Sequence, residues 1–162
     1  MVVEVSEFIN VRERATALGC KIPTEVALLP WNFIEAESAD ELLDSSEAST
    51  VQKILREANI PAARIEKYGS RFRTYNPKSA EWIGPAIFIG ANLLSQNPDL
   101  PKIILDTLLE YLNGHFRGLV GNKRAKIRFV IEKKSVNVKA DYDGPLEGTS
   151  ELYDTLEEVS KD

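Results

Sequence analysis

Apolar residues recur at helical or strand spacing through most of the chain, and this pattern sets the elements that we expect. Residues 6–18 carry apolar side chains at intervals of three and four, which predicts a helix that Gly19 ends. Residues 1–5 precede it as a short strand. The run 25–33 has strand composition, but Pro30 cannot donate a ladder hydrogen bond. This run is therefore expected as an edge strand, a bulged strand or two short pieces.

Two capping-box patterns follow, each with a serine three residues before a glutamate or glutamine. They pair Ser38 with Glu41 and Ser49 with Gln52. The first lies in an acidic segment that is typical of a solvated face. The second opens a predicted helix that Pro61 stops.

Residues 64–75 predict a hairpin that turns at Gly69-Ser70, a dipeptide suited to a two-residue turn. One face would be basic and aromatic, with Glu66 directly across from Arg73. Such a face is able to stack on bases or bind an anion. We favour an ordinary exposed face, because the patch is short for a single-strand binding site. The candidate residues are Arg64, Tyr68, Arg71 and Arg73.

The most apolar stretch is 81–98, EWIGPAIFIGANLLSQNP. With Pro85 at its first position, it predicts a helix as far as about Gln96, paired with a second helix that starts at Asp99 or Leu100. A membrane span needs roughly 20 apolar residues, and this run is too short. We favour a buried core helix; a helix completed by a partner protein and a helix inserted in a membrane surface are the alternatives.

The final third shows the clearest alternation. Residues 126–142 predict a second hairpin, and Asp143 to Pro145 predict a turn. A closing helix capped by Thr149 or Ser150 follows, and its acidic face is expected to neutralise the basic hairpin. The inward residues of this helix are expected to be Leu152, Leu156 and Val159. The chain as a whole, 1–162, predicts one α+β domain: a small, mostly antiparallel sheet of two hairpins and the VALL strand, covered by the apolar helix pair, with N-terminal and C-terminal helices.

Composition narrows the function classes. One histidine and one cysteine exclude a zinc site of four Cys or His ligands, and we expect no cofactor or metal. A net charge of −5 disfavours nonspecific nucleic-acid binding. The N-terminus does not have the pattern of a secretory signal, and the single cysteine agrees with a reducing compartment, so we expect a cytoplasmic protein without a membrane span.

Catalytic signals are sparse. Glu132 and Lys134 form a Glu-x-Lys pattern after an apolar strand, which resembles the metal-binding end of restriction-type nucleases. Asp106 or Asp99 would supply the upstream acidic ligand, Glu132 would be the second Mg²⁺ ligand, and Lys134 would polarise a water. We favour a solvated turn for this pattern. His115 is a candidate general base, but its place near the end of a helix favours a role against the helix dipole.

From Leu105 to Val159 the order is an apolar helix, a basic hairpin, and a short acidic helix that follows DYDGPLEG. This layout resembles the small effector-associated domains that accompany nucleases, proteases and NTPases in bacterial conflict systems. The resemblance implies an adaptor or regulator and carries over no catalytic residue.

The preferred function is therefore a noncatalytic interaction or regulatory subunit that docks to a larger partner protein, or to itself, in a bacterial antiviral defence system. Aromatic and apolar anchors tend to dominate such interfaces. A Mg²⁺-dependent nuclease and a small nucleic-acid-binding module are the alternatives. The expected partner contacts are Trp31, Trp82, Ile83 and Phe88.

Overall fold

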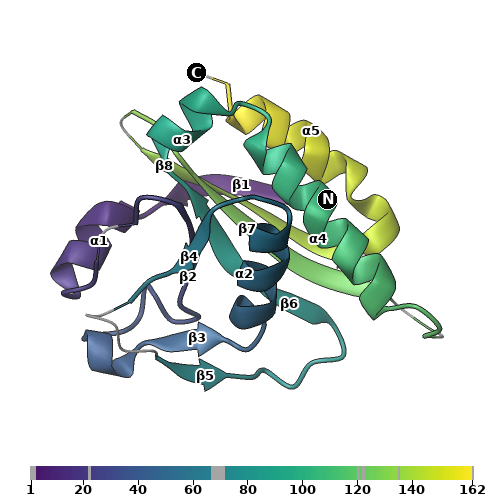
Figure 1. Cartoon of the computed structure of the whole chain (residues 1–162), viewed down its shortest axis with the longest axis horizontal. Helices are drawn as coiled ribbons and strands as arrows, with labels where there is room; N and C mark the ends of the chain where they lie inside the picture. Colours follow the sequence, from purple (N-terminus) through teal and green to yellow (C-terminus); the bar gives the residue numbers. More distant parts are fainter. Residues whose placement is uncertain are drawn as a thin grey trace.

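The computed structural model describes residues 3–21, 23–66, 72–119, 121, 123–134 and 136–161 (Figure 1). The strands are β1 (Val3–Phe8), β2 (Val26–Leu29), β3 (Leu43–Ser45), β4 (Ala62–Arg64), β5 (Arg73–Tyr75), β6 (Trp82–Ile89), β7 (Arg124–Glu132) and β8 (Asn137–Pro145). The α-helices are α1 (Val11–Ala17), α2 (Ala48–Glu57), α3 (Ala91–Gln96), α4 (Leu100–His115) and α5 (Ser150–Val159). Short 3₁₀ turns occupy Ala39–Glu41 and Leu146–Gly148.

A six-stranded sheet in the order β1-β8-β7-β6-β2-β4 forms the centre of the fold. The β1–β8, β8–β7 and β6–β2 pairs are antiparallel, and the β7–β6 and β2–β4 pairs are parallel. A separate sheet pairs β3 with β5 in parallel. The expected α+β class with a mostly antiparallel sheet is confirmed.

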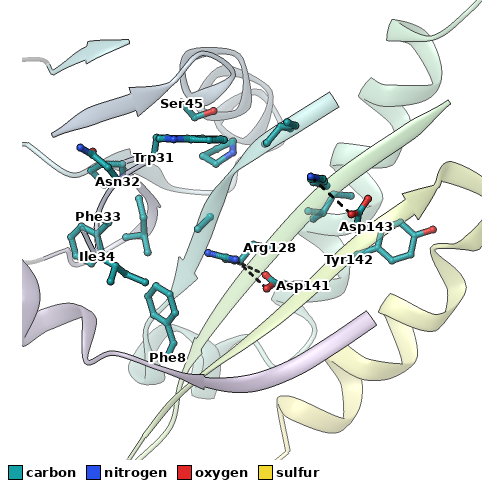
Figure 2. A pocket seen from close by; sticks show the side chains of 18 of the residues that line it. Phe8, Trp31, Asn32, Phe33, Ile34, Ser45, Arg128, Asp141, Tyr142 and Asp143 are labelled. Carbon is teal, nitrogen blue, oxygen red and sulfur yellow. Dashed lines mark hydrogen bonds and ion pairs between the residues drawn. The ribbon is translucent and has the colours of Figure 1, made fainter. Parts of the chain in front are cut away.

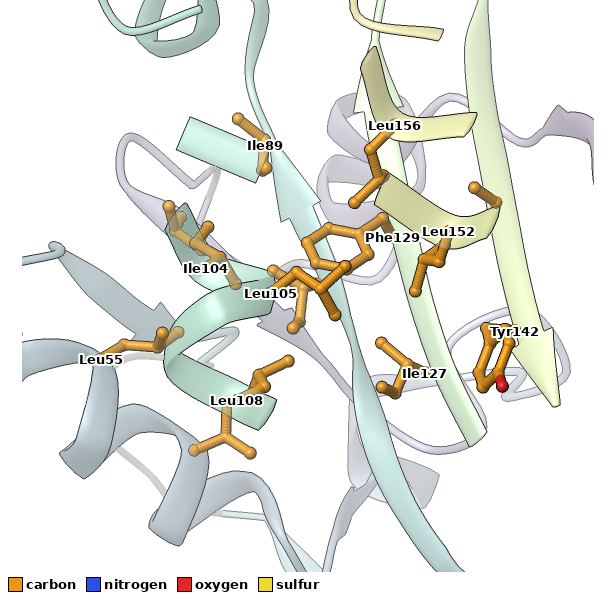
Figure 3. Close-up of a cluster of buried hydrophobic side chains, with 14 of the residues drawn as sticks. Leu55, Ile89, Ile104, Leu105, Leu108, Ile127, Phe129, Tyr142, Leu152 and Leu156 are labelled. Atoms are coloured by element: carbon orange, nitrogen blue, oxygen red, sulfur yellow. The ribbon is translucent and has the colours of Figure 1, made fainter. Parts of the chain in front are cut away.

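Helices α2, α4 and α5 cover one face of the large sheet (Figure 1). The apolar face of α4 packs there, and the core joins all three helices to β6, β7 and β8 (Figure 3). Burying one such side chain stabilises the fold by about 1.5–3 kcal/mol. The labelled core includes Leu55, Ile89, Ile104, Leu105, Leu108, Ile127, Phe129, Leu152 and Leu156.

The predicted helix from Pro85 to Gln96 is wrong over its first half. Residues up to Ile89 form β6, and only α3 is helical. Because β6 is an interior strand between β2 and β7, its second half, Ile87 to Ile89, is buried on both faces. Pro85 lies where the register with β7 shifts, a place that tolerates a missing amide donor. Within the described ranges, no helix is long and apolar enough to cross a membrane.

The two strands of the first predicted hairpin do not pair with each other. Its first strand, β4, pairs with β2, and its second strand, β5, pairs with β3 in the other sheet. The turn at 67–71 lies outside the described residues. The expected pairing of Glu66 with Arg73 is therefore wrong, since Arg73 lies opposite Leu43.

The boundary between β1 and α1 differs from the predicted one, and neither predicted capping box forms. β1 runs to Phe8, and α1 begins only after Asn10, whose side chain accepts a hydrogen bond from the Glu13 amide at 3.0 Å. Gly19 ends the helix as predicted, with φ +72°. Ser38 makes no side-chain cap hydrogen bond. Ser49 lies inside α2, whose N-cap residue is Glu47.

The second hairpin and the closing helix are confirmed. Phe129 pairs with Ala140 and Ile131 with Val138, and the inward residues of α5 are buried. The turn expected at residues 143–145 is wrong, because these residues extend β8 as the partners of 124–126. The longer hairpin adds one more row of charged side chains to the sheet.

Candidate binding groove

The face of the large sheet opposite α4 and α5 is only partly covered. Helix α1 and the segment after β2 pack on it through a second core that includes Val11, Leu29, Phe33, Phe88 and Val130. Beside that core, the sheet and loop 30–35 enclose a groove of about 760 Å³ (Figure 2). Its lining comes from β1, β6, β7 and β8 on the sheet side and from the loop on the other.

The loop wall of the groove is apolar and exposed. Trp31 is 42% exposed and Ile34 is 44% exposed, although both line the groove with Phe33 (Figure 2). The Trp31 ring lies 4.8 Å from the ring of Tyr75, between centroids, with the planes tilted by 37°. Because such contacts favour one ring orientation, Tyr75 helps to position the indole.

Arg14 of α1 fixes the backbone of this wall. Its Nε donates to the Phe33 carbonyl at 2.9 Å, and its Nη2 donates to the Ile34 carbonyl at 3.1 Å and to the Ala36 carbonyl. Hydrogen bonds from a charged donor are stronger than neutral ones. One side chain therefore holds three successive parts of the loop.

Asn32 holds the same wall from the side of β3. Its Oδ1 accepts a hydrogen bond from the Leu43 amide at 2.8 Å, and its Nδ2 donates to the Glu41 carbonyl at 2.9 Å. The Trp31 amide donates to the Leu43 carbonyl at 2.6 Å. The wall is thus ordered before any ligand binds, which reduces the entropy cost of binding.

The sheet side of the groove carries ion pairs across β7 and β8. Arg128 donates to both carboxylate oxygens of Asp141, at 2.5 and 3.1 Å (Figure 2). The acids and bases of the hairpin therefore neutralise one another, and the expected neutralisation by α5 is not what the described ion pairs show. The remaining pairs are Lys139 with Asp141 at 3.3 Å, and Arg124 and Lys126 with Asp143 at 3.6 and 4.0 Å.

Glu132, at the end of β7, joins three elements. It accepts hydrogen bonds from Arg12 at 2.6 and 3.1 Å and from the Ala91 amide at 2.8 Å. Burial raises the pKa of Glu132, but the hydrogen bonds from Arg12 and Ala91 outweigh it and hold the pKa below its ordinary value. Lys134 lies beyond the strand and is exposed.

Asp106 lies in a different environment. It is on α4 and accepts a hydrogen bond from the Tyr153 hydroxyl of α5, on the helix-covered face of the sheet. Burial and this hydrogen bond raise the pKa of Tyr153. Asp99 is exposed near Lys102. In the described part of the chain, no group of three or more His, Cys, Asp or Glu residues is placed to hold a metal ion. Asp106 and Glu132 of the nuclease alternative are also not brought together, because Asp106 contacts α5 on one side of the large sheet and Glu132 binds Arg12 of α1 on the other.

The expected partner contacts divide into two groups. Trp31 is exposed and Ile83 is half-buried, and both line the groove. Trp82 and Phe88 are 4% and 1% exposed and pack in the two cores, so neither is available to a partner. Side-chain alternation explains the difference between the neighbours Trp82 and Ile83: Trp82 packs on the α4 side, with its ring 6.5 Å from that of Tyr111, whereas Ile83 faces the groove. Phe88 lies further along β6, in the second core beneath α1.

The described residues among the candidates for anion or nucleic-acid binding do not share one face. Arg64 lies 3.8 Å from Asp44, and both side chains are largely buried. Arg73 is exposed on β5, in the other sheet. Tyr68 and Arg71 lie outside the described residues. His115 ends α4 as expected and stacks on Tyr111, with ring centroids 5.8 Å apart.

Local sequence patterns do not reveal the groove, because its walls come from segments that are distant in the chain. The available signal was the sequence PWNFI at 30–34, where large apolar residues follow a strand and a proline. Comparisons with protein-family models, with curated proteins and with solved structures find no match for this chain.

Proposed function

We propose that this protein is a noncatalytic interaction or regulatory subunit that binds a larger partner protein in the groove between loop 30–35 and the sheet. The observation that carries the proposal is the exposed wall of Trp31 and Ile34, held in place by Arg14 and Asn32. A rigid aromatic anchor beside a polar surface is typical of the centre and rim of protein interfaces.

The chemistry of the groove supports binding rather than catalysis. The basic and acidic side chains of the groove floor, Arg128, Lys126, Asp141 and Asp143, are engaged with one another across the hairpin, whereas the two glutamates at the rim, Glu4 and Glu35, form no ion pair with a described residue. A general acid or base needs a proton-transfer group free to reach substrate. These paired groups instead provide a polar surface of fixed geometry.

A protein segment fits the groove better than a small ligand. Sites for small molecules are mostly apolar and enclose most of the ligand. Here one wall is apolar and the opposite side carries solvated ion pairs. The resemblance of residues 105–159 to effector-associated domains favours an effector of a bacterial defence system as the partner.

Site-specific cross-linking tests the proposal. The photoreactive residue p-benzoylphenylalanine replaces Ile34 in the groove, or Ile103 on α4 as the control, because the two side chains are similarly exposed, at 44% and 47%. The proteins are expressed in the source cells and irradiated. We expect one dominant adduct with a larger protein from position 34 and none from position 103.

Equal adducts from both positions, or none from position 34, would contradict the proposal. An adduct of twice the chain mass would show that the groove binds a second copy of this chain and not a larger partner.

A further inference from the structure

Strand β1 forms the rim of the groove and one edge of the large sheet (Figure 1). Its Glu4 and Phe8 line the groove. Residues 3–8 pair with β8 from Val3–Tyr142 to Phe8–Asn137, and in the described part of the chain β1 pairs with no other strand. The outer side of β1 therefore presents unpaired backbone donors and acceptors.

The side chains of β1 favour the binding of a further strand at this edge of the sheet. Val3 and Val5 point to the same face because strand side chains alternate. Val3 is 2% exposed, but Val5 is 51% exposed. A further strand beside β1 would cover part of the Val5 side chain, which neither β8 nor α5 buries.

The charges of the rim differ from those of the groove floor. Asp141 and Asp143 on β8 are paired with arginines and lysines. Glu4 on β1 and Glu35 across the groove are exposed, as is Glu7 on the other face of β1, and none of the three forms an ion pair with any described residue. The rim thus holds uncompensated negative charge next to an open strand edge.

We infer that an extended, basic segment of the partner adds as a strand alongside β1. Lysine or arginine side chains of the segment lie opposite Glu4 and Glu7, and an apolar side chain lies opposite Val5. Backbone hydrogen bonds supply part of the affinity, and the alternating side chains supply the specificity. The inference rests on the proposed function in that the segment belongs to the same partner.

A second copy of the chain is a poor occupant of this edge. Two β1 strands paired in parallel and in register would place each glutamate opposite its own copy. In antiparallel pairing the strand pair would carry four glutamates and no basic side chain. Like charges opposite each other destabilise a strand pair. Charge complementarity therefore selects a basic strand from another protein.

Peptide binding to the full chain, followed by NMR spectroscopy of backbone amides, tests the inference without the partner. The probe is the hexapeptide Ac-TKTVKT-NH2, which places lysines opposite Glu4 and Glu7 and valine opposite Val5 in antiparallel pairing. The comparison peptides are Ac-TETVET-NH2, with reversed charge, and Ac-GKGGKG-NH2, with the same charge and no strand propensity.

We expect the first peptide to shift the amides of residues 3–8 and to bind more tightly than either comparison peptide. The double variant Glu4→Gln with Glu7→Gln should weaken its binding about fivefold, since exposed ion pairs contribute up to about 1 kcal/mol together. The control variant, Glu13→Gln with Glu57→Gln, has the same net charge and should bind like the wild type.

Equal binding of the reversed-charge peptide, equal loss in both double variants, or shifts confined to other strands would overturn the inference. These outcomes leave the cross-linking at position 34 unaffected. Conversely, a chain that binds the peptide at β1 but gives no adduct at position 34 would contradict the proposed function alone.

Discussion

The Trp31 indole lies 4.8 Å from the Tyr75 ring, and this contact joins the loop after β2 to β5 of the small sheet. The two residues are 44 positions apart, and neither is buried. Two exposed aromatic rings held together at the mouth of a groove form a surface that a partner can use without prior rearrangement.

Arg14 is expected to control the order of this surface. Arg14→Met removes the hydrogen bonds to the carbonyls of residues 33, 34 and 36 and should lower the free energy of unfolding by about 1–3 kcal/mol. Hydrogen exchange should also accelerate at the amides of residues 31–36. Urea unfolding and amide exchange measure the two effects.

Arg117→Met is the matched control, because Arg117 is exposed and makes no side-chain hydrogen bond with a described residue. Unchanged exchange in loop 31–36 of the Arg14 variant would show that the wall is ordered by other contacts.

Gly84 is expected to be required for the bulge of β6. A Cβ at this position would lie 2.6 Å from two carbons of the Trp82 ring, which is itself fixed in the core. Gly84→Ala should therefore destabilise the fold by about 1–3 kcal/mol in urea unfolding.

The control for that change is Gly114→Ala in α4, where no heavy atom lies within 4 Å of the added Cβ. Alanine has the higher helix propensity, so this variant should be neutral or stabilised by up to about 1 kcal/mol. Similar stabilities for the two variants would contradict the tight packing of Trp82 on Gly84.

Glu132 should make stability depend on acidic pH. Its folded-state pKa is below the ordinary value of 4.5, so the carboxylate stabilises the fold above about pH 4.5. The contribution is lost as the pH falls through the folded-state pKa. Thermal unfolding between pH 3 and 7 should show a smaller loss of stability at low pH for Glu132→Gln than for the wild type.

The same variant leaves Arg12 without its carboxylate partner, so its stability at pH 7 should fall by about 1–2 kcal/mol. Parallel pH curves for the two proteins would contradict a stabilising role for the ionised carboxylate.

Tyr153 is expected to link α5 to α4 through Asp106. Tyr153→Phe should cost about 1 kcal/mol in urea unfolding because one hydrogen bond to a charged acceptor is lost. Tyr111→Phe is the control, since no hydrogen bond of the Tyr111 hydroxyl is found among the described residues. Equal effects of the two changes would show that the hydrogen bond contributes nothing.

The sequence was most informative where neighbouring elements pair. Alternation in 126–142 predicted the second hairpin, and the spacing of Leu152, Leu156 and Val159 predicted the inward face of α5. Both patterns reflect one buried face and one exposed face, so the period is visible.

The sequence was least informative where a strand is buried on both faces, or where strands pair with partners far away in the chain. β6 is apolar on both faces, so its residues show no period, and Pro85 was read as a helix start. The separation of β4 and β5 into two sheets depends on β2 and β3, which no local turn signal reveals. The groove depends on Arg14 reaching the loop some 20 residues later, which local patterns do not encode.

Trp31 is expected to be the main anchor of the proposed partner in the groove. The most direct measurement is the dissociation constant of the cross-linked partner for the wild type, for Trp31→Ala and for Ile103→Ala, each with its unfolding curve. An exposed anchor at the centre of an interface typically contributes 2 kcal/mol or more, so Trp31→Ala should weaken binding about thirtyfold. Ile103→Ala should leave it unchanged. Equal affinity of the wild type and Trp31→Ala would contradict binding in this groove.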